Sequence, residues 1–239
     1  MTAAVHRNQP QQYDELAGEW WRPGGVFELL HWLAAARAEL VPPAGRPGAV
    51  LVDVGCGGGL LAPGLTDKGY RHVGVDLSRP ALEQASARAV RAAVGDATAL
   101  PMADGCADVV VAGELLEHVH DLPGTVAQLC RVLRPGGLLV LDTLNSTVLS
   151  RLVTITVGER LIPAARGIHD PKLYVDPRRL TAECARHGVR LRVRGIRPSI
   201  PGLLRWLAGV GGGGRMLAIR STAVAYQGIG RKAGRAPVE

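Results

Sequence analysis

The chain has 239 residues, of which 47% are hydrophobic and 4% aromatic, and its formal net charge is +7. This length allows one α/β domain with additions and a substantial core. So few aromatic rings leave little for base stacking, and we expect no nucleic-acid substrate. The positive charge fits contact with an anionic surface and equally a solvated, arginine-rich face. The oligomeric state stays open.

Cysteine usage and hydropathy indicate a cytoplasmic protein. The cysteines have no C-x-x-C spacing, so we expect reduced thiols. The first twenty residues lack a basic and then apolar signal pattern, and no run of about 18 apolar residues is present to span a membrane. The cysteines are Cys56, Cys106, Cys130 and Cys184.

In chain order, the sequence predicts an α/β fold with a doubly wound, mostly parallel sheet of seven strands. Residues 1–11 are polar and predict a disordered arm, followed by helices at 13–21 and 26–40. From residue 49 strand and helix signals alternate, which is typical of βαβ units. An extra segment at 145–170 follows the fifth strand, and a basic tail covers 229–239. The expected strands are 49–54, 71–76, 91–95, 108–112, 137–142, 189–196 and 216–226, and the expected helices of this region are 60–68, 79–88, 123–132 and 177–187.

A glycine-rich turn follows the first expected strand. Asp53, Gly55, Gly57 and Gly59 alternate with other residues at the carboxyl end of this strand, where open parallel sheets bind ligands. The dinucleotide pattern G-x-G-x-x-G fails when counted from Gly55, because Leu60 stands at the third glycine position, and from Gly57 only a loose form passes. The spacing instead resembles motif I of class I S-adenosylmethionine (SAM)-dependent methyltransferases.

Further motifs extend the resemblance to one family. They are Tyr-Asp-Glu-Leu-Ala, Trp-Trp-x-Pro-Gly and Leu-Leu-His within 13–40, Glu-Leu-Leu-Glu-His-Val at 114–119, Arg-Pro-Gly-Gly at 134–137, Thr-Leu-Asn at 143–145 and Gly-Ile-His-Asp at 167–170. Together with the glycine turn they resemble the ubiquinone-biosynthesis O-methyltransferase family, which methylates a hydroxyl on polyprenylated phenols. The resemblance implies one domain over 12–228, with a helical cap (12–41), a SAM-binding core (49–142), an inserted lid or membrane segment (145–170) and the rest of the sheet (177–228).

The resemblance also implies the residues of a SAM site. Asp76 ends the second expected strand and is placed to bind the ribose hydroxyls, and Asp96 ends the third, where such enzymes contact adenine. Arg37 matches an arginine that reaches the methionyl carboxylate, whose two oxygens suit the guanidinium fork. Gly113 is expected beside the cofactor after the fourth strand. The remaining members are Asp53, Gly55 and Gly57 of the glycine turn.

Acidic and histidine residues follow the fourth expected strand. Glu114, Glu117 and His118 have the spacing i, i+3, i+4, which places side chains on one helix face. The resemblance implies a divalent cation such as Mg²⁺ on these three residues, where it would act as a Lewis acid on a catechol. The alternative is a Glu114–His118 pair that only stabilises the helix start. Glu117 and His118 are also expected to be catalytic, together with His169, because a histidine can take the phenol proton.

These patterns predict a SAM-dependent O-methyltransferase that acts on a phenol or catechol hydroxyl of a small lipophilic aromatic, such as a polyprenylated quinone precursor. Residues 198–214 depart from the family, so a polyketide-like natural product stays open as the acceptor, and a SAM-binding module without catalysis is a third reading. In 146–162 the apolar residues can share one helical face apart from Arg151 and Arg160, which predicts docking at the anionic inner face of the membrane. A lid packed on the protein's own sheet is the alternative.

Overall fold

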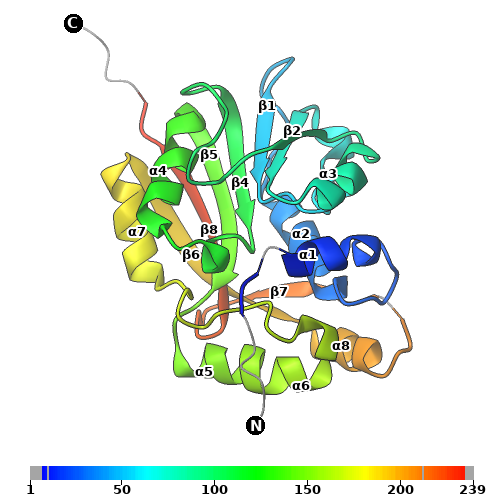
Figure 1. Cartoon of the computed structure of the whole chain (residues 1–239). Helices are drawn as coiled ribbons and strands as arrows, with labels where there is room; N and C mark the ends of the chain where they lie inside the picture. Colours follow the sequence, from blue (N-terminus) through cyan, green and yellow to red (C-terminus); the bar gives the residue numbers. More distant parts are fainter. Residues whose placement is uncertain (1–6, 10, 212, 235–239) are drawn as a thin grey trace, which may run out of the picture.

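An eight-stranded sheet forms the centre of the molecule (Figure 1). The computed structural model describes residues 7–9, 11–211 and 213–234. The strand order is β3-β2-β1-β4-β5-β8-β6-β7, with parallel pairing from β3 to β5 and antiparallel pairing from β5 onward. The strands are β1 (Val50–Val54), β2 (Arg71–Asp76), β3 (Arg91–Val94), β4 (Ala107–Gly113), β5 (Leu133–Leu144), β6 (Val189–Pro198), β7 (Met216–Ile219) and β8 (Ala225–Lys232).

Helices cover both faces of this sheet. The α-helices are α1 (Gln11–Glu15), α2 (Glu28–Glu39), α3 (Arg79–Ser86), α4 (Leu122–Val132), α5 (Val148–Arg151), α6 (Glu159–Leu161), α7 (Pro177–Arg186) and α8 (Ile200–Leu207). Short 3₁₀ helices occupy Ala17–Glu19, Ala62–Lys68, Leu116–His118 and Pro163–Ala165. The helix expected at 60–68 is therefore a 3₁₀ helix, and the one expected at 13–21 is two short pieces.

The alternation of side chains along β1 explains why both faces need covering. Val52 and Val54 pack into the cluster that includes residues of α4 and α7, whereas Leu51 packs into the cluster of α2 and the 62–68 helix. Successive side chains of a strand face opposite sides of the sheet, so a strand that is apolar throughout has to be buried on both. This is the expected doubly wound α/β arrangement.

The winding direction of the sheet reverses between β1 and β4, its two central parallel strands. In open α/β sheets ligands bind outside the carboxyl ends of the strands at such a switch point. The glycine turn follows β1 directly, and Gly113 is the last residue of β4. The fold therefore brings the glycine turn and residues 113–118 to one crevice.

The strand count differs from the prediction of seven. Residues 216–226 form parts of two strands, β7 and β8, because the chain turns between Ile219 and Ala225. β8 runs on to Lys232, which takes residues 229–232 out of the predicted basic tail; residues 235–239 lie outside the described residues. β5 begins at Leu133, so the Arg-Pro-Gly-Gly segment lies within the strand and not before it.

The predicted disordered arm is also wrong where the structure describes it. The backbone N–H of Asn8 donates to the carbonyl oxygen of Gly167 at 2.8 Å, so residues 7–9 lie against the insert. The first helix already begins at Gln11. The rest of the predicted arm, residues 1–6 and 10, lies outside the described residues.

The insert lies at the carboxyl edge of the sheet beside α8 (Figure 1). Its helical run is continuous from Val148 to Leu161, as α5, a π-helical turn over Leu152–Gly158 and α6. Thr147 caps this run by accepting the Ser150 N–H at 3.0 Å. This run confirms the helical prediction for the insert. The neighbouring α8 lies within residues 198–214, the segment that departs from the family. Among the described helices, none has the length and hydropathy needed to cross a membrane.

Candidate active site

A cavity of about 760 Å³ opens at the switch point. One part is walled by the glycine turn and by the ends of β2 and β4, and another by α2, α8 and the insert. All the predicted site residues except Glu117 line it. Those that do are Arg37, Asp53, Gly55, Gly57, Asp76, Asp96, Gly113, Glu114, His118 and His169.

The glycine turn is held by Trp20 and Trp21 of the N-terminal cap. A Cβ added to Gly57, whose φ is +50°, would collide with the Trp20 ring, so this position needs glycine on two counts. The Trp21 indole N–H donates to the Gly58 carbonyl at 2.8 Å. Both tryptophans thus hold the glycine turn from the N-terminal cap.

The three strand-end acids have different surroundings. Asp76 accepts the backbone N–H groups of Gly57 and Ser78 at 2.8 Å and 2.9 Å, and burial raises its pKa. Asp53 is buried, 3.4 Å from the His72 imidazole Nε2. Asp96 is exposed, and hydrogen bonds from the N–H and hydroxyl of Thr98 lower its pKa. All three acids line the cavity at the ligand edge of the sheet.

Arg37 crosses from α2 to the end of the sheet. Its Nε and Nη2 donate to the two oxygens of Asp142 at 2.7 Å and 2.9 Å, and the guanidinium lies over Gly113, where a Cβ would overlap it. The neighbouring carboxylate raises the pKa of Arg37 despite burial, so the side chain is charged. Asp142 takes two of the five guanidinium N–H groups, so three are left for the predicted contact with a cofactor carboxylate, two of them on Nη1.

Glu114 and Glu117 do not lie on one helix face, which corrects the sequence prediction. Glu114 has a left-handed backbone (φ +50°), and the 3₁₀ turn begins only at Leu116. Glu117 is fully buried and accepts the Thr143 hydroxyl at 2.7 Å. Burial raises the pKa of both carboxyl groups, that of Glu117 to about 7 and that of Glu114 well above its ordinary value. The two carboxyl groups are neighbours, and of the two only Glu114 lines the cavity.

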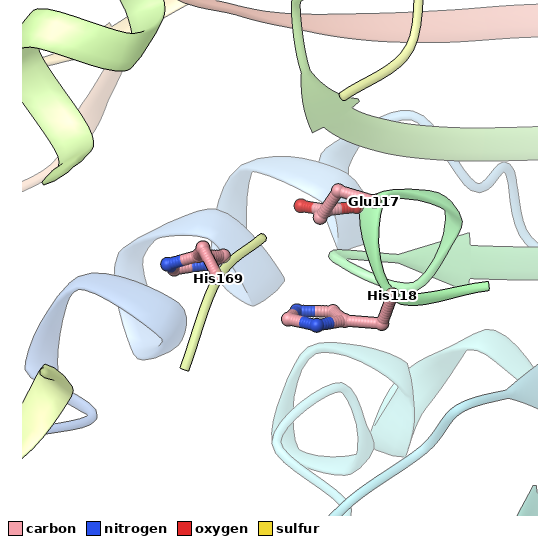
Figure 2. A group of neighbouring side chains, drawn as sticks. All are labelled: Glu117, His118 and His169. Atoms are coloured by element: carbon pink, nitrogen blue, oxygen red, sulfur yellow. The ribbon is translucent and has the colours of Figure 1, made fainter. Parts of the chain in front are cut away.

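Two histidines from distant segments meet in the cavity (Figure 2). The rings of His118, after β4, and His169, in the insert, stack with centroids 5.2 Å apart and planes inclined by 28°. Burial lowers the pKa of His118 to about 3 and that of His169 to about 4, so both rings are neutral at pH 7. The His118 ring contacts the Tyr13 hydroxyl through Nε2 at 3.1 Å and the Asn8 amide oxygen through Nδ1 at 2.7 Å.

Comparisons with known proteins decide the family. A family model described as a methyltransferase domain matches residues 52–141. The chain is 34% identical to the ubiquinone biosynthesis O-methyltransferase of Alkalilimnicola ehrlichii over 74% of this chain and 75% of that protein. It is 32% identical to the protein of the same name from an Azoarcus species, over 76% of this chain and 82% of that protein. The chain belongs to the ubiquinone-biosynthesis O-methyltransferase family. It is therefore a SAM-dependent methyltransferase, as predicted.

Solved structures agree on the fold. A SAM-dependent methyltransferase of Thermotoga maritima, described as a possible histamine N-methyltransferase, covers 93% of this chain and 98% of its own at a TM-score of 0.65 and 17% identity. The [4+2]-cyclase SpnF covers 97% of both chains at a TM-score of 0.61 and 18% identity. At such identities the likeness shows the class I fold alone, because one fold hosts many chemistries.

The arrangement of acids and histidines does not fit the predicted Mg²⁺. Among the described residues, the group whose ligand atoms lie within 4.8 Å of one another is Glu117, His118 and His169, without Glu114. Mg²⁺ prefers oxygen ligands, whereas this group has two imidazoles. The lone pairs lie in the ring planes, and two stacked rings do not aim them at one point. Both His118 nitrogens also have protein partners. The structure therefore does not support a divalent cation at this site.

Two cavity residues were missed by sequence reasoning. The sequence predicts Asn8 in a disordered arm and Tyr13 in a helix, without a site role for either. In the structure both contact His118 and line the cavity. Tyr13 stands inside the Tyr-Asp-Glu motif shared with the family, which was a usable signal. For Asn8 the sequence offers none, because a polar residue ahead of the first helix is typical of a free terminus.

Proposed function

We propose that this family member transfers the SAM methyl group to a phenol or catechol hydroxyl of an acceptor with an apolar tail, of the polyprenylated quinone-precursor type. The observation that carries the proposal is one cavity with two unlike halves. The half at the glycine turn holds the acids and His118, and the other half has an apolar wall. An aromatic head and an aliphatic tail match those halves.

The apolar half is built from three separate elements. Leu30 and Leu33 come from α2, and Val157 and Leu161 come from the insert. From α8 come Leu203, Trp206 and Leu207, and the Trp206 indole N–H donates to the Gly24 carbonyl at 3.1 Å, which ties α8 to the N-terminal cap. Each buried CH₂ of a tail would contribute about 0.8 kcal/mol. The wall suits a tail of several carbons.

The polar half supplies the groups that methyl transfer needs. SAM supplies an electrophilic methyl on a sulfonium, and the acceptor oxygen has to be aligned behind it. A phenol has a pKa of about 10, so removal of its proton assists the reaction at neutral pH. His118 and His169 line the cavity, and each neutral ring has a lone pair that can accept this proton. Arg37 and Asp76, which line the same cavity, would bind the cofactor's carboxylate and ribose.

A second acceptor class has one specific observation in its favour. α8 lines the cavity, and it comes from the segment that departs from the family. A polyketide-like aromatic without a tail would use the same polar half and a differently filled apolar half. The two classes differ in how rate depends on tail length.

We also propose that the insert and α8 contact the membrane, where a tailed acceptor would reside. The two elements lie side by side beyond the carboxyl edge of the sheet (Figure 1). Both expose large apolar side chains, with Val148 81% and Leu204 61% exposed. Arg151, Arg160 and Arg205 belong to the same two elements. Apolar helix faces with basic neighbours are typical of interfacial helices on anionic lipid.

The proposed function is tested with the purified protein, SAM and a series of 4-alkylcatechols of increasing chain length, with mass spectrometry of the O-methyl product. The KM should fall as the chain lengthens. Leu203→Trp, which fills the apolar half, should raise the KM for long chains, whereas Leu204→Trp on the exposed side of the same helix should not. Faster methylation of tailless polyketide-like phenols would favour the second acceptor class, and no product from either would contradict O-methylation of phenols.

A further inference from the structure

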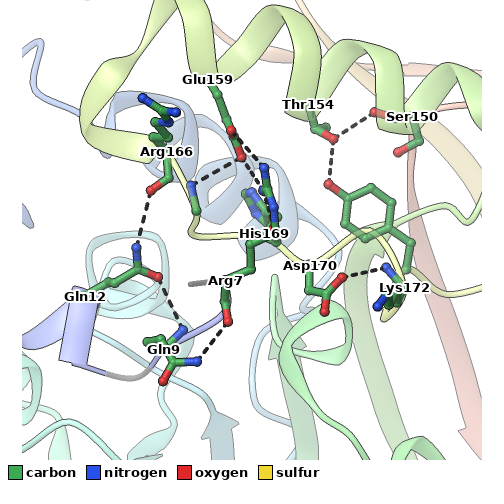
Figure 3. Close-up of polar contacts among 12 residues, drawn as sticks. Arg7, Gln9, Gln12, Ser150, Thr154, Glu159, Arg166, His169, Asp170 and Lys172 are labelled. Atoms are coloured by element: carbon green, nitrogen blue, oxygen red, sulfur yellow. Dashed lines mark hydrogen bonds and ion pairs between the residues drawn. The ribbon is translucent and has the colours of Figure 1, made fainter. Parts of the chain in front are cut away.

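Residues 7–9 and 11–13 lie at the cavity and contact both the insert and the loop after β4. Arg7 pairs with Glu159 and donates to the His169 carbonyl at 2.9 Å, and the Gln12 amide donates to the Arg166 carbonyl at 3.3 Å (Figure 3). Between these contacts stands Asn8, whose left-handed backbone (φ +56°) is one that asparagine tolerates better than most residues. Asn8 is thus held from both sides.

The Asn8 amide makes two hydrogen bonds to the same residue. Its Nδ2 lies 2.9 Å from the His118 carbonyl oxygen, and its Oδ1 lies 2.7 Å from His118 Nδ1. A carbonyl oxygen can only accept, so the amide nitrogen has to face it, and this fixes which end of the amide is which. The amide oxygen can only accept as well. His118 Nδ1 must therefore carry a hydrogen.

The hydrogen on Nδ1 also determines the protonation of Nε2 on the other side of the His118 ring. A neutral imidazole carries one hydrogen, so with Nδ1 protonated the lone pair is on Nε2. The neighbour of Nε2 is the Tyr13 hydroxyl at 3.1 Å, which can donate to that lone pair. Tyr13 and His118 both line the cavity. In free histidine the hydrogen prefers Nε2, so the protein has reversed the ordinary tautomer at this site.

We infer that Asn8 is a positioning residue that fixes the Nδ1–H tautomer of His118 and so presents Nε2 as the proton acceptor for the methyl acceptor's hydroxyl. The role of Nε2 as proton acceptor rests on the proposed function, whereas the assignment of the tautomer does not. The acceptor hydroxyl takes the place of the Tyr13 hydroxyl at Nε2. Its proton passes to Nε2 while the oxygen bonds to the methyl carbon and the electron pair of the breaking C–S bond returns to sulfur. The products are the methyl ether, S-adenosylhomocysteine and an imidazolium whose Nδ1–H stays hydrogen-bonded to the Asn8 amide oxygen.

Selective ¹⁵N-histidine labelling with long-range proton–nitrogen spectra reads the tautomer directly, and His118→Gln identifies the signal among the seven histidines. The wild type should show protonated Nδ1 and bare Nε2 at pH 7.5. Asn8→Gly removes the amide without straining the left-handed backbone, and should let His118 return toward the Nε2–H form. Asn8→Asp keeps an acceptor for Nδ1–H and should keep the tautomer. A wild-type Nε2–H signal, or no change in Asn8→Gly, would overturn the inference.

Kinetics with SAM and a 4-alkylcatechol separate a positioning role of Asn8 from simple attachment of residues 7–9 to the insert. Asn8→Gly should lower kcat at least tenfold, which is part of the factor of about 10² to 10⁴ that a general base contributes, and leave the KM for SAM unchanged. Gln12→Ala removes a bond to the insert without touching His118 and is the matched control. An equal loss of kcat in Gln12→Ala would contradict positioning. If the wild type methylates no phenol, the proposed function fails, and the tautomer is still decided by the spectra.

Discussion

The guanidinium of Arg37 and the carboxylate of Asp142 form a two-pronged hydrogen-bonded pair, 2.7 Å and 2.9 Å long, across the face of Gly113. The same carboxylate accepts the backbone N–H of Glu114 at 3.1 Å. One buried acid thus connects α2 to the ends of β4 and β5, and aims the free edge of the arginine at the crevice. Since Arg37 has almost no room to move, the cofactor site is sensitive to a single methyl group at Gly113.

Gly113→Ala is expected to weaken SAM binding at least tenfold. The added Cβ would overlap the guanidinium, so Arg37 would have to leave Asp142 or the end of β4 would have to shift. Isothermal titration calorimetry with SAM measures the change. Gly18→Ala, at a site with open space and no left-handed backbone, should bind SAM like the wild type. Unchanged affinity in Gly113→Ala would show that Arg37 has no part in binding the cofactor.

Asp76→Ala should weaken SAM binding by about 1.5 to 3 kcal/mol, the range for hydrogen bonds to a charged group. Asp76 ends β2 on the ligand edge and already accepts two backbone N–H groups that orient its carboxylate. The same calorimetry checks it, with the exposed Asp67→Ala as control. Tight binding of NAD without any heat from SAM would contradict the cofactor assignment altogether.

Residues governed by local pattern were predictable from the sequence. The glycine turn and the strand-end acids follow from strand, turn and helix signals that lie within a few residues of each other, and they line one cavity as expected. Contacts between distant segments were not predictable. Glu117 was expected on a helix face with Glu114, but the left-handed backbone at Glu114 turns the chain there. The Glu117 carboxylate instead accepts a hydrogen bond from the Thr143 hydroxyl of β5. Asn8 meets His118 only because the insert holds residues 7–9 in place.

Methyl transfer is expected to survive thorough chelation. The stacked His118 and His169 do not aim two lone pairs at one ion, and Glu114 is absent from the group. Activity on a 4-alkylcatechol should be the same after treatment with EDTA as before, and added Mg²⁺ or Mn²⁺ should raise it less than twofold. Loss of activity with EDTA that Mg²⁺ restores would bring back the metal site predicted from the sequence.

The partly buried His169 should make the protein less stable in mild acid. Its pKa is about 4 in the folded protein and about 6.5 when unfolded. Between these values the unfolded chain binds more protons, so stability falls as the pH drops from about 6.5 toward 4. From pH 7.5 to 5.0 this one group should remove about 2 kcal/mol of unfolding free energy. Urea unfolding of His169→Asn should show a shallower loss, and the exposed His120→Asn should match the wild type.

Docking on anionic membranes is the prediction that separates a membrane segment from a simple lid. Wild-type protein should co-float with liposomes that contain phosphatidylglycerol at low salt, where the attraction of basic residues to the lipid is least screened, and less so as salt is added. Val148→Glu with Leu152→Glu places two acids on side chains that are 81% and 50% exposed, and should abolish flotation. Thr66→Glu with Ser86→Glu changes the net charge equally at exposed sites on other elements and should retain most of it. A wild type that stays at the bottom of the gradient at low salt would mean that the insert only covers the cavity, and a freely dissolved acceptor would then fit the enzyme better than one embedded in lipid.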